Sequence, residues 1–170
     1  MQITLVMTVL GRDRPGIVEA LSASVKSCEG NWLESRLSHL AGHFAGILQL
    51  SLPEEKKDEF EAAIAKLEED EGLRCVFSDS EPITGVGKVV RFEVVGQDRP
   101  GIVFALTDLL AEFNANVESL DTHCSSAPMS GETLFHADLR VALPEDIDMN
   151  ALEARLADIG DELMLDVHYE

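Results

Sequence analysis

One eight-residue segment of this chain occurs twice, and this repeat constrains the fold more than any other feature of the sequence. Gly11-Arg-Asp-Arg-Pro-Gly-Ile-Val18 returns 85 residues later as Gly96-Gln-Asp-Arg-Pro-Gly-Ile-Val103, with seven of eight positions identical. Self-similarity at a fixed period is typical of one structural unit present in several copies. We therefore predict two copies of one unit. The repeated loop is the first place to look for function, because loops vary freely unless their backbone has a role.

Apolar residues around each copy of the loop follow the periods of strands and helices. Residues 3–9 alternate as in a strand with one buried face, and helix-spaced apolar residues follow the loop in both copies. A strand pair comes next, then a second helix opening at Pro53-Glu-Glu or Pro144-Glu-Asp, then a final strand at residues 73–78 or 163–169. This order predicts an α+β, ferredoxin-like βαββαβ unit: a four-stranded antiparallel sheet with both helices on one face.

The two predicted domains comprise residues 1–80 and residues 88–170. Residues 81–87 form a short linker between them that is rich in turn-forming residues. The second copy is longer than the first within its strand pair, and the extra residues lie in the segment 124–132, which contains Pro, Gly and Ser. We expect this segment to be a hairpin loop rather than strand.

Charge and cysteine content exclude several classes of function. The net charge is −19 and both halves are acidic without a Lys/Arg cluster, so we expect no direct binding of nucleic acid. The surplus carboxylates are interpreted as solvating the surface, because no calcium-loop pattern occurs. The first residues lack the basic region of a signal peptide, and no apolar run reaches the roughly 20 residues that span a bilayer. Three cysteines without CxxC spacing indicate a reducing compartment, so the predicted location is the cytoplasm.

The repeated loop is predicted to attract a small anion such as a carboxylate. Pro15 is expected in the first helical turn, and Asp13 is placed to cap the helix. Gly16 removes a side chain where free N–H groups meet the positive end of the helix dipole. The second copy carries the same three residues as Pro100, Asp98 and Gly101. The same residues also make a good helix start; that explanation suffices for one copy and is weaker for two.

Two further residue pairs leave alternatives open. Arg14 and Arg99 could bind a ligand carboxylate or could pair with neighbouring Asp and Glu residues. Asn31 and Asn116 begin the second strand of each unit, where topology is expected to bring them next to the loop. There they could hydrogen-bond to a ligand or could serve only as turn formers.

No catalytic or metal-binding pattern stands out. The spacing of the loop glycines matches a phosphate loop, but Ile17 and Ile102 stand where that motif requires lysine. His123 and Cys124 are neighbours, and alternating sides of a strand keep such neighbours apart. We therefore expect no metal, no cofactor and no enzyme activity.

The motif Gly-x-Asp-Arg-Pro-Gly-Ile-Val between a first strand and a first helix, with Asn at the start of the second strand, resembles the ACT domain. Here it is present in tandem across essentially the whole chain. Two ACT domains with nothing else attached are the arrangement of the glycine cleavage system transcriptional repressor group, and residues 127–135 are also similar to that group. The resemblance implies an amino-acid-sensing protein without catalysis, whose ligands lie where ACT domains meet.

Carried over to this chain, the resemblance implies ligand-binding residues in the first loop and at the start of the second strand of each copy. These are Asp13, Arg14, Pro15, Gly16, Ile17 and Asn31 in the first copy, and Asp98, Arg99, Pro100, Gly101, Ile102 and Asn116 in the second. Trp32 replaces the small β-branched residue usual after the Asn, whereas Val117 conforms. Ala115 replaces Gly30. These departures predict two pockets that differ in size or occupancy.

The leading hypothesis is a cytoplasmic regulatory protein that binds a small amino acid, with glycine as a candidate. It would regulate transcription of glycine cleavage type through a protein partner such as a DNA-binding activator, and a homo-oligomer is expected. A ligand that bridges two units stabilises one relative orientation through its differential affinity for it. The alternative is a structural or assembly subunit that uses paired ACT sheets for oligomerisation, with the loops as plain helix starts.

Overall fold

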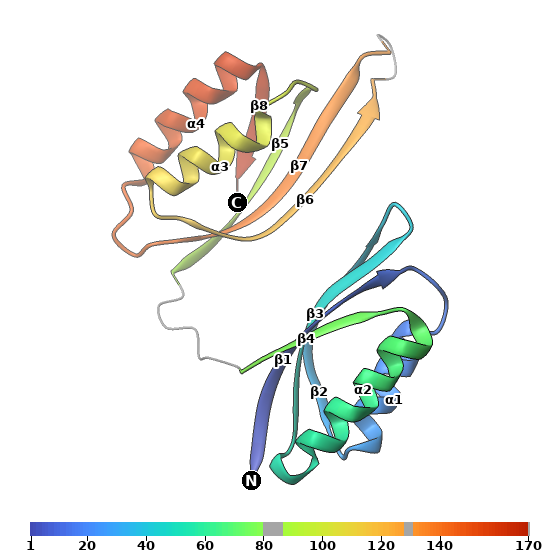
Figure 1. Cartoon of the computed structure of the whole chain (residues 1–170). Coiled ribbons are helices and arrows are strands. Elements are labelled where there is room, and N and C mark those ends of the chain that lie inside the picture. Colours follow the sequence, from blue (N-terminus) through green and yellow to red (C-terminus); the bar gives the residue numbers. More distant parts are fainter. Residues whose placement is uncertain (80–86, 128–130, 170) are drawn as a thin grey trace. The chain divides into compact units, whose positions relative to one another are not determined.

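The computed structural model describes residues 1–79, 87–127 and 131–169. Its contacts divide the chain into two compact units, Met1–Pro82 and Ile83–Glu170, which we call unit 1 and unit 2 and describe separately. Each unit has a four-stranded sheet with two helices on one face (Figure 1). The predicted order βαββαβ is confirmed in both units. Residues 81–86 of the predicted linker lie outside the described residues.

Unit 1 is an antiparallel sheet in the order β2-β3-β1-β4, so that β2 and β4 are its edges. A short 3₁₀ helix at Glu54–Lys56 precedes its second α-helix. Its elements are β1 (Gln2–Arg12), α1 (Ile17–Ser27), β2 (Asn31–Leu40), β3 (His43–Pro53), α2 (Lys57–Glu71) and β4 (Arg74–Asp79).

Unit 2 repeats this architecture with the sheet order β6-β7-β5-β8, and its edges are β6 and β8. Its elements are β5 (Lys88–Gln97), α3 (Ile102–Glu112), β6 (Asn116–Ser126), β7 (Thr133–Leu143), α4 (Met149–Leu163) and β8 (Leu165–Tyr169).

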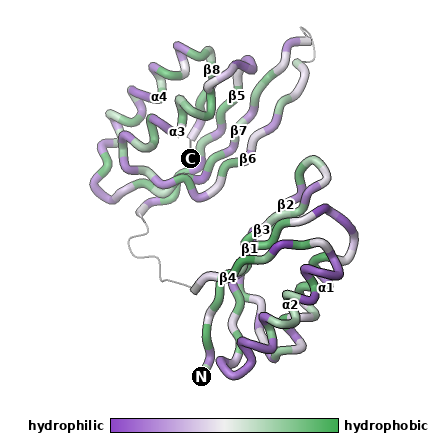
Figure 2. The backbone as a smooth tube through the Cα atoms, in the orientation of Figure 1, coloured by the Kyte–Doolittle hydropathy of each residue, from purple (hydrophilic) through white to green (hydrophobic). Residues whose placement is uncertain are grey.

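Each unit has its own hydrophobic core between the helices and the sheet. In unit 1, Leu21 of α1 and Phe60 of α2 pack with Met7 of β1, and all three are fully buried. In unit 2, Leu109 of α3 and Leu152 of α4 occupy the corresponding layer. Hydrophobic and hydrophilic residues alternate along the elements of both units (Figure 2). Because each buried side chain of this size contributes about 1.5–3 kcal/mol, these two clusters hold the elements that position the loops.

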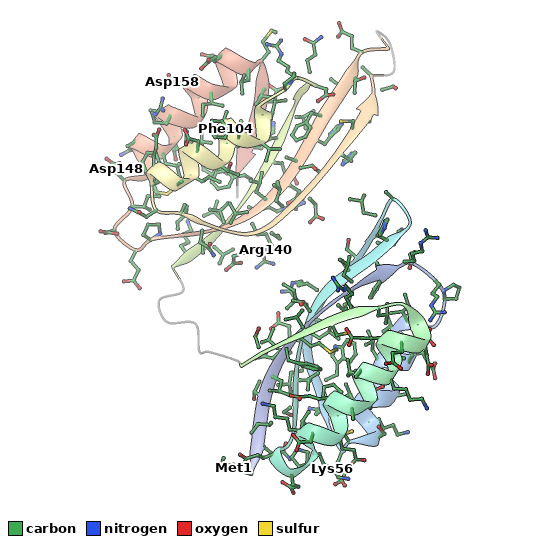
Figure 3. All side chains as sticks on the ribbon, viewed as in Figure 1. Met1, Lys56, Phe104, Arg140, Asp148 and Asp158 are labelled. Carbon is green, nitrogen blue, oxygen red and sulfur yellow. The ribbon has the colours of Figure 1, made fainter. Side chains whose placement is uncertain are left out.

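Three predicted boundaries in unit 2 are wrong. Residues 124–126 are not loop, because β6 continues to Ser126 and stays paired with β7, which satisfies their backbone groups. The second helix does not open at Pro144. It begins at Met149, because the Asp148 carboxylate accepts hydrogen bonds from the backbone amides of Asn150 and Ala151, at 3.0 Å and 3.1 Å. Asp148 is labelled at the start of α4 in Figure 3. That helix runs to Leu163, so the final strand begins at 165 rather than 163.

Candidate functional site

The predicted binding loops join β1 to α1 and β5 to α3, as expected, but their helix starts differ from the prediction. The N-cap residues are Gly16 and Gly101, and neither helix has a side-chain cap. The expected capping by Asp13 and Asp98 is therefore wrong. Pro15 and its counterpart are also not in the first helical turn, because each lies two residues before the first helical residue.

The two loop glycines are required by backbone conformation. Gly16 has φ of 94° and Gly101 has φ of 96°, in the left-handed region that side chains other than glycine's disfavour. A Cβ atom at either position would meet no heavy atom within 4 Å, so crowding does not explain the glycine.

Backbone N–H groups at both helix starts are available to a ligand. The first hydrogen bonds of the helices run from Ala20 N to Gly16 O and from Ala105 N to Gly101 O, each at 2.9 Å. Among the described residues, no hydrogen bond uses the two amides that directly precede these donors, those of Val18 and Glu19 in α1 and of Val103 and Phe104 in α3. Such amides, together with the positive end of the helix dipole, favour a bound anion.

The loop arginines have different partners in the two units. Arg14 forms an ion pair with Glu71, the last residue of α2. Arg99 instead donates to neutral acceptors, with 3.2 Å from Nη2 to Gln97 Oε1 and 3.6 Å to Met164 Sδ. Within the described part of the chain Arg99 forms no ion pair. Of the two alternatives predicted for these arginines, pairing with a neighbouring carboxylate is therefore observed in unit 1 alone.

The first helical turn also differs in charge. Glu19 lies in the first turn of α1, where its carboxylate interacts favourably with the helix dipole. Phe104, at the same position of α3, is 72% exposed and leaves that turn without an acidic residue (Figure 3). The start of α3 is therefore the more favourable position for an external carboxylate.

The remaining predicted site residues are not all close to the loops. Ile17 and Ile102 are 3% and 2% exposed and belong to the cores, so only their backbone could touch a ligand. Trp32 is partly buried against the core of unit 1, as Val117 is in unit 2. Both side chains thus pack against a core, so unit 1 accommodates the larger tryptophan at the position where unit 2 has valine.

Asn31 and Asn116 lie at the far end of their own sheets. The loop follows Arg12, which is opposite His43, whereas Asn31 is opposite Ser51 near the other end of β3. At about 3.3 Å per residue this separates the Asn from the loop by roughly 25 Å along the sheet. Asn116 is likewise opposite Ala142, far from the Gln97 end of β5. The expected adjacency of Asn and loop within one unit is wrong.

The sequence did not reveal a second feature, on the helix-free face of the unit 2 sheet. His123 and His136 face each other across β6 and β7 with stacked rings 4.5 Å apart, beside a cavity of about 340 Å³. A hydrogen bond from Arg91 lowers the pKa of Asp138 in this cavity. Among the described residues, no three groups converge in a way that could hold a metal ion. Cross-strand partners of this kind follow from strand register, which periodicity alone does not give.

No helix within the described ranges is long and apolar enough to cross a bilayer.

Comparisons with known proteins agree with this geometry. ACT domain models match residues 3–78 and 90–161. The chain is 26% identical over 161 residues to the glycine cleavage system transcriptional repressor of Escherichia coli (strain K12), covering 94% of this chain and 85% of that protein.

Two solved structures share the whole architecture. One, described as an unknown protein of Galdieria sulphuraria, has a TM-score of 0.86 at 29% identity and covers 100% of this chain and 98% of its own. The other is named provisionally as a glycine cleavage system transcriptional repressor. It has a TM-score of 0.72 at 19% identity and covers 100% and 97%. The resemblance inferred from the loop motif is confirmed: the chain belongs to the ACT domain family, as two ACT domains in tandem, and is related to the glycine cleavage system transcriptional repressor.

Proposed function

We propose that this chain is a non-catalytic regulatory protein that binds a small amino acid at the β5–α3 loop of unit 2. One observation carries the proposal: two features occur together at this loop. Arg99 has no ion-pair partner among the described residues, and the start of α3 has no side-chain cap. A positive side chain and free helix amides both favour a carboxylate.

The same loop offers a group of opposite charge for the ammonium of an amino acid. Asp98 is exposed, and its carboxylate does not cap the helix. A zwitterion can therefore place its carboxylate at Arg99 and the amides of Val103 and Phe104, and its ammonium at Asp98. Glycine is the first amino acid to test, because the E. coli relative is named for the glycine cleavage system.

The role of the asparagines follows from their distance to the loop. Because Asn31 and Asn116 lie at the far ends of their own sheets, either can reach a loop-bound ligand only if the loop belongs to another ACT unit. A ligand held in that way would favour one arrangement of units over another. The protein would then pass this state to a protein partner, such as a DNA-binding activator. A direct contact with DNA is disfavoured by the net charge of −19.

Calorimetric titration of the full chain with glycine and a panel of amino acids tests the proposal. We expect binding by the native chain and a loss of affinity of about tenfold or more for Arg99→Gln, because a hydrogen bond to a charged group is removed. Arg14→Gln is the matched control and should change affinity little, since Arg14 already forms an ion pair with Glu71. Equal losses for both variants would contradict the assignment to unit 2.

A second candidate function, an assembly subunit without a ligand, is favoured by one specific observation. On the helix-free face of unit 1, Ile47 and Val76 flank Thr8, with Leu10 beside them, and the three aliphatic side chains are 51–62% exposed. Exposed apolar side chains gathered on one face of a sheet are typical of protein interfaces. No heat and no thermal shift with any amino acid would favour this alternative.

A further inference from the structure

The last strand of each unit forms an open edge of the sheet, and in unit 1 this edge is protected. The Glu68 carboxylate of α2 accepts a hydrogen bond from the backbone N–H of Cys75 in β4, with 2.6 Å between N and Oε1. Because this amide donates to a side chain of α2, we infer that it points toward the open edge rather than toward β1. Native sheets commonly block such edges against pairing with another chain.

Gly160 stands in unit 2 at the position that Glu68 has in unit 1. Each accepts the backbone hydrogen bond that ends its helix, from Gly72 after α2 and from Met164 after α4. Both of the residues that donate this bond are left-handed. A glycine has no carboxylate, so α4 cannot protect the neighbouring edge as α2 does.

Val167 in turn stands at the position of Cys75. Cys75 is opposite Val9 in β1, and Val167 is opposite Val94, the repeat counterpart of Val9 in β5. The Val167 amide should therefore also point away from its sheet. Outside the β5–β8 ladder, no hydrogen bond from this amide is found among the described residues. At this position the β8 edge therefore lacks the side-chain acceptor that Glu68 supplies to the β4 edge.

A groove of about 370 Å³ lies between α4 and β8, and Gly160, which stands in place of a glutamate, lines it. Its apolar part includes Leu156 and Ala157 of α4 and Leu165 and Val167 of β8. The charged groups that line it are Glu153, Asp161 and Asp166, and no lysine or arginine lines it. The groove therefore joins an unpaired strand edge to a negative surface.

We propose that the β8 edge of unit 2, with this groove, is a docking site for an extended segment of a partner protein that carries lysine or arginine at alternate positions. The segment adds to the sheet beyond β8. Backbone hydrogen bonds, including one from the Val167 amide, supply affinity in strand addition, and the side chains at alternate positions supply specificity. The three carboxylates select basic side chains. None of these residues belongs to the β5–α3 loop, so the proposal goes beyond amino acid binding and can fail independently of it.

The test uses the full chain labelled with ¹⁵N and a short acetylated peptide in which lysine and valine alternate. We expect peptide-dependent shifts at residues 165–169 and slower hydrogen exchange at the Val167 amide. A peptide with glutamate in place of lysine should not bind. A peptide with proline in place of its central valine should bind about tenfold more weakly or not at all, because it lacks a backbone donor.

Gly160→Glu separates strand addition from simple charge attraction. It places a carboxylate at the position that Glu68 has in unit 1. A Cβ atom at position 160 would lie 3.0 Å from the Leu165 carbonyl oxygen, so the start of β8 must shift slightly to accept it, and Gly160→Ala is the control for this shift. Ala154→Glu adds the same charge on an exposed part of α4 that does not line the groove. We expect Gly160→Glu to weaken lysine-peptide binding about tenfold and Ala154→Glu to leave it unchanged or slightly stronger.

Four outcomes would overturn the proposal. Tighter binding by both variants, or equal binding of the proline peptide, would mean that charge alone attracts the peptide. Absence of peptide binding to the native chain would show that this edge is not a docking site for such a segment. Protection of the Val167 amide that rises with protein concentration in the absence of peptide would assign the edge to a second copy of this chain.

Discussion

Unit 1 places two carboxylates next to its repeated loop, and unit 2 has apolar residues at both positions. Glu19 and Glu71 of unit 1 correspond to Phe104 and Leu163 of unit 2. The same replacement of an acidic residue occurs at the sheet edge, where Glu68 corresponds to Gly160. Two domains with one backbone and one loop motif thus present different chemistry. The loop arginine and the edge amide each have a carboxylate partner in unit 1, and neither has one among the described residues of unit 2.

This difference indicates a division of roles. The carboxylates of unit 1 satisfy Arg14 and the Cys75 amide from within the domain. In unit 2 the equivalent groups, Arg99 and the Val167 amide, have neither an ion pair nor a carboxylate acceptor among the described residues. Unit 1 is therefore interpreted as the more self-contained domain and unit 2 as the domain that binds.

The largest expected effect tests whether the units are energetically separate. Phe60→Ala in unit 1 and Leu152→Ala in unit 2 remove fully buried, structurally equivalent side chains, and each should destabilise its own unit by about 3–5 kcal/mol. Trp32, the single tryptophan, reports on unit 1. Its fluorescence midpoint in urea should fall for Phe60→Ala and stay constant for Leu152→Ala. A fall for both would show that the units unfold together.

Removal of the edge protection should have a smaller effect. Glu68→Ala leaves the Cys75 amide without its acceptor and should lower the free energy of unfolding of unit 1 by about 1–2 kcal/mol. Burial and the nearby Glu68 raise the pKa of the Cys75 thiol to about 11, so the substitution should also lower that pKa and speed alkylation of Cys75 at pH 8. Exposed Cys124 provides the internal reference for this labelling. An unchanged midpoint and labelling rate would contradict a structural role for Glu68.

The loop comparison can be sharpened by transferring a carboxylate to unit 2. Phe104→Glu gives the start of α3 the acidic residue that α1 has. It should stabilise the helix slightly and weaken binding of an amino acid carboxylate about threefold, through competition of about 0.3–1 kcal/mol for the helix dipole. Calorimetry against Phe104→Gln, which has the same size without the charge, isolates the electrostatic part. Equal affinities of the two variants would argue against a ligand carboxylate at this helix.

The smallest effect concerns the β2–β3 hairpin, which has no short equivalent in unit 2. Ala41 and Gly42 have φ of 49° and 78°, so an alanine occupies a left-handed position of a two-residue turn. Ala41→Asn should stabilise unit 1 by about 0.5 kcal/mol, because asparagine tolerates this conformation better. The urea midpoint of unfolding, followed by Trp32 fluorescence, should rise for Ala41→Asn. Ala45→Asn on the neighbouring strand is the control and should not raise this midpoint.

Much of the fold was predictable because it depends on local patterns. The duplicated loop, the two apolar periods and the order of elements gave two ferredoxin-like units, and the structure has them. The errors are at boundaries, where competing local signals of similar strength meet. At the start of α4, for example, the Asp148 cap prevailed over Pro144 with its following acidic residues.

The candidate site was predicted less completely. The loop residues are together because they are consecutive in the sequence, but the asparagines are not beside them, because α1 and α3 carry the chain to the other end of each sheet. Ile17 and Ile102 belong to the core. The long-range partners of the two arginines, Glu71 for Arg14 and Met164 for Arg99, lie more than 50 positions away in the sequence.

The amino-acid sequence by itself determined that this chain is one unit written twice, with a glycine-bearing helix start in each copy, because turns and hydrophobic periods are properties of neighbouring residues. Tertiary structure decided which partners these loops and edges have. Glu71 reaches Arg14 and Glu68 reaches Cys75 only after α2 packs on the sheet. In unit 2 the same packing brings Met164 to Arg99 in place of a carboxylate. Such contacts depend on the fold because hydrogen bonds and ion pairs form only between groups that it brings within a few ångströms of each other.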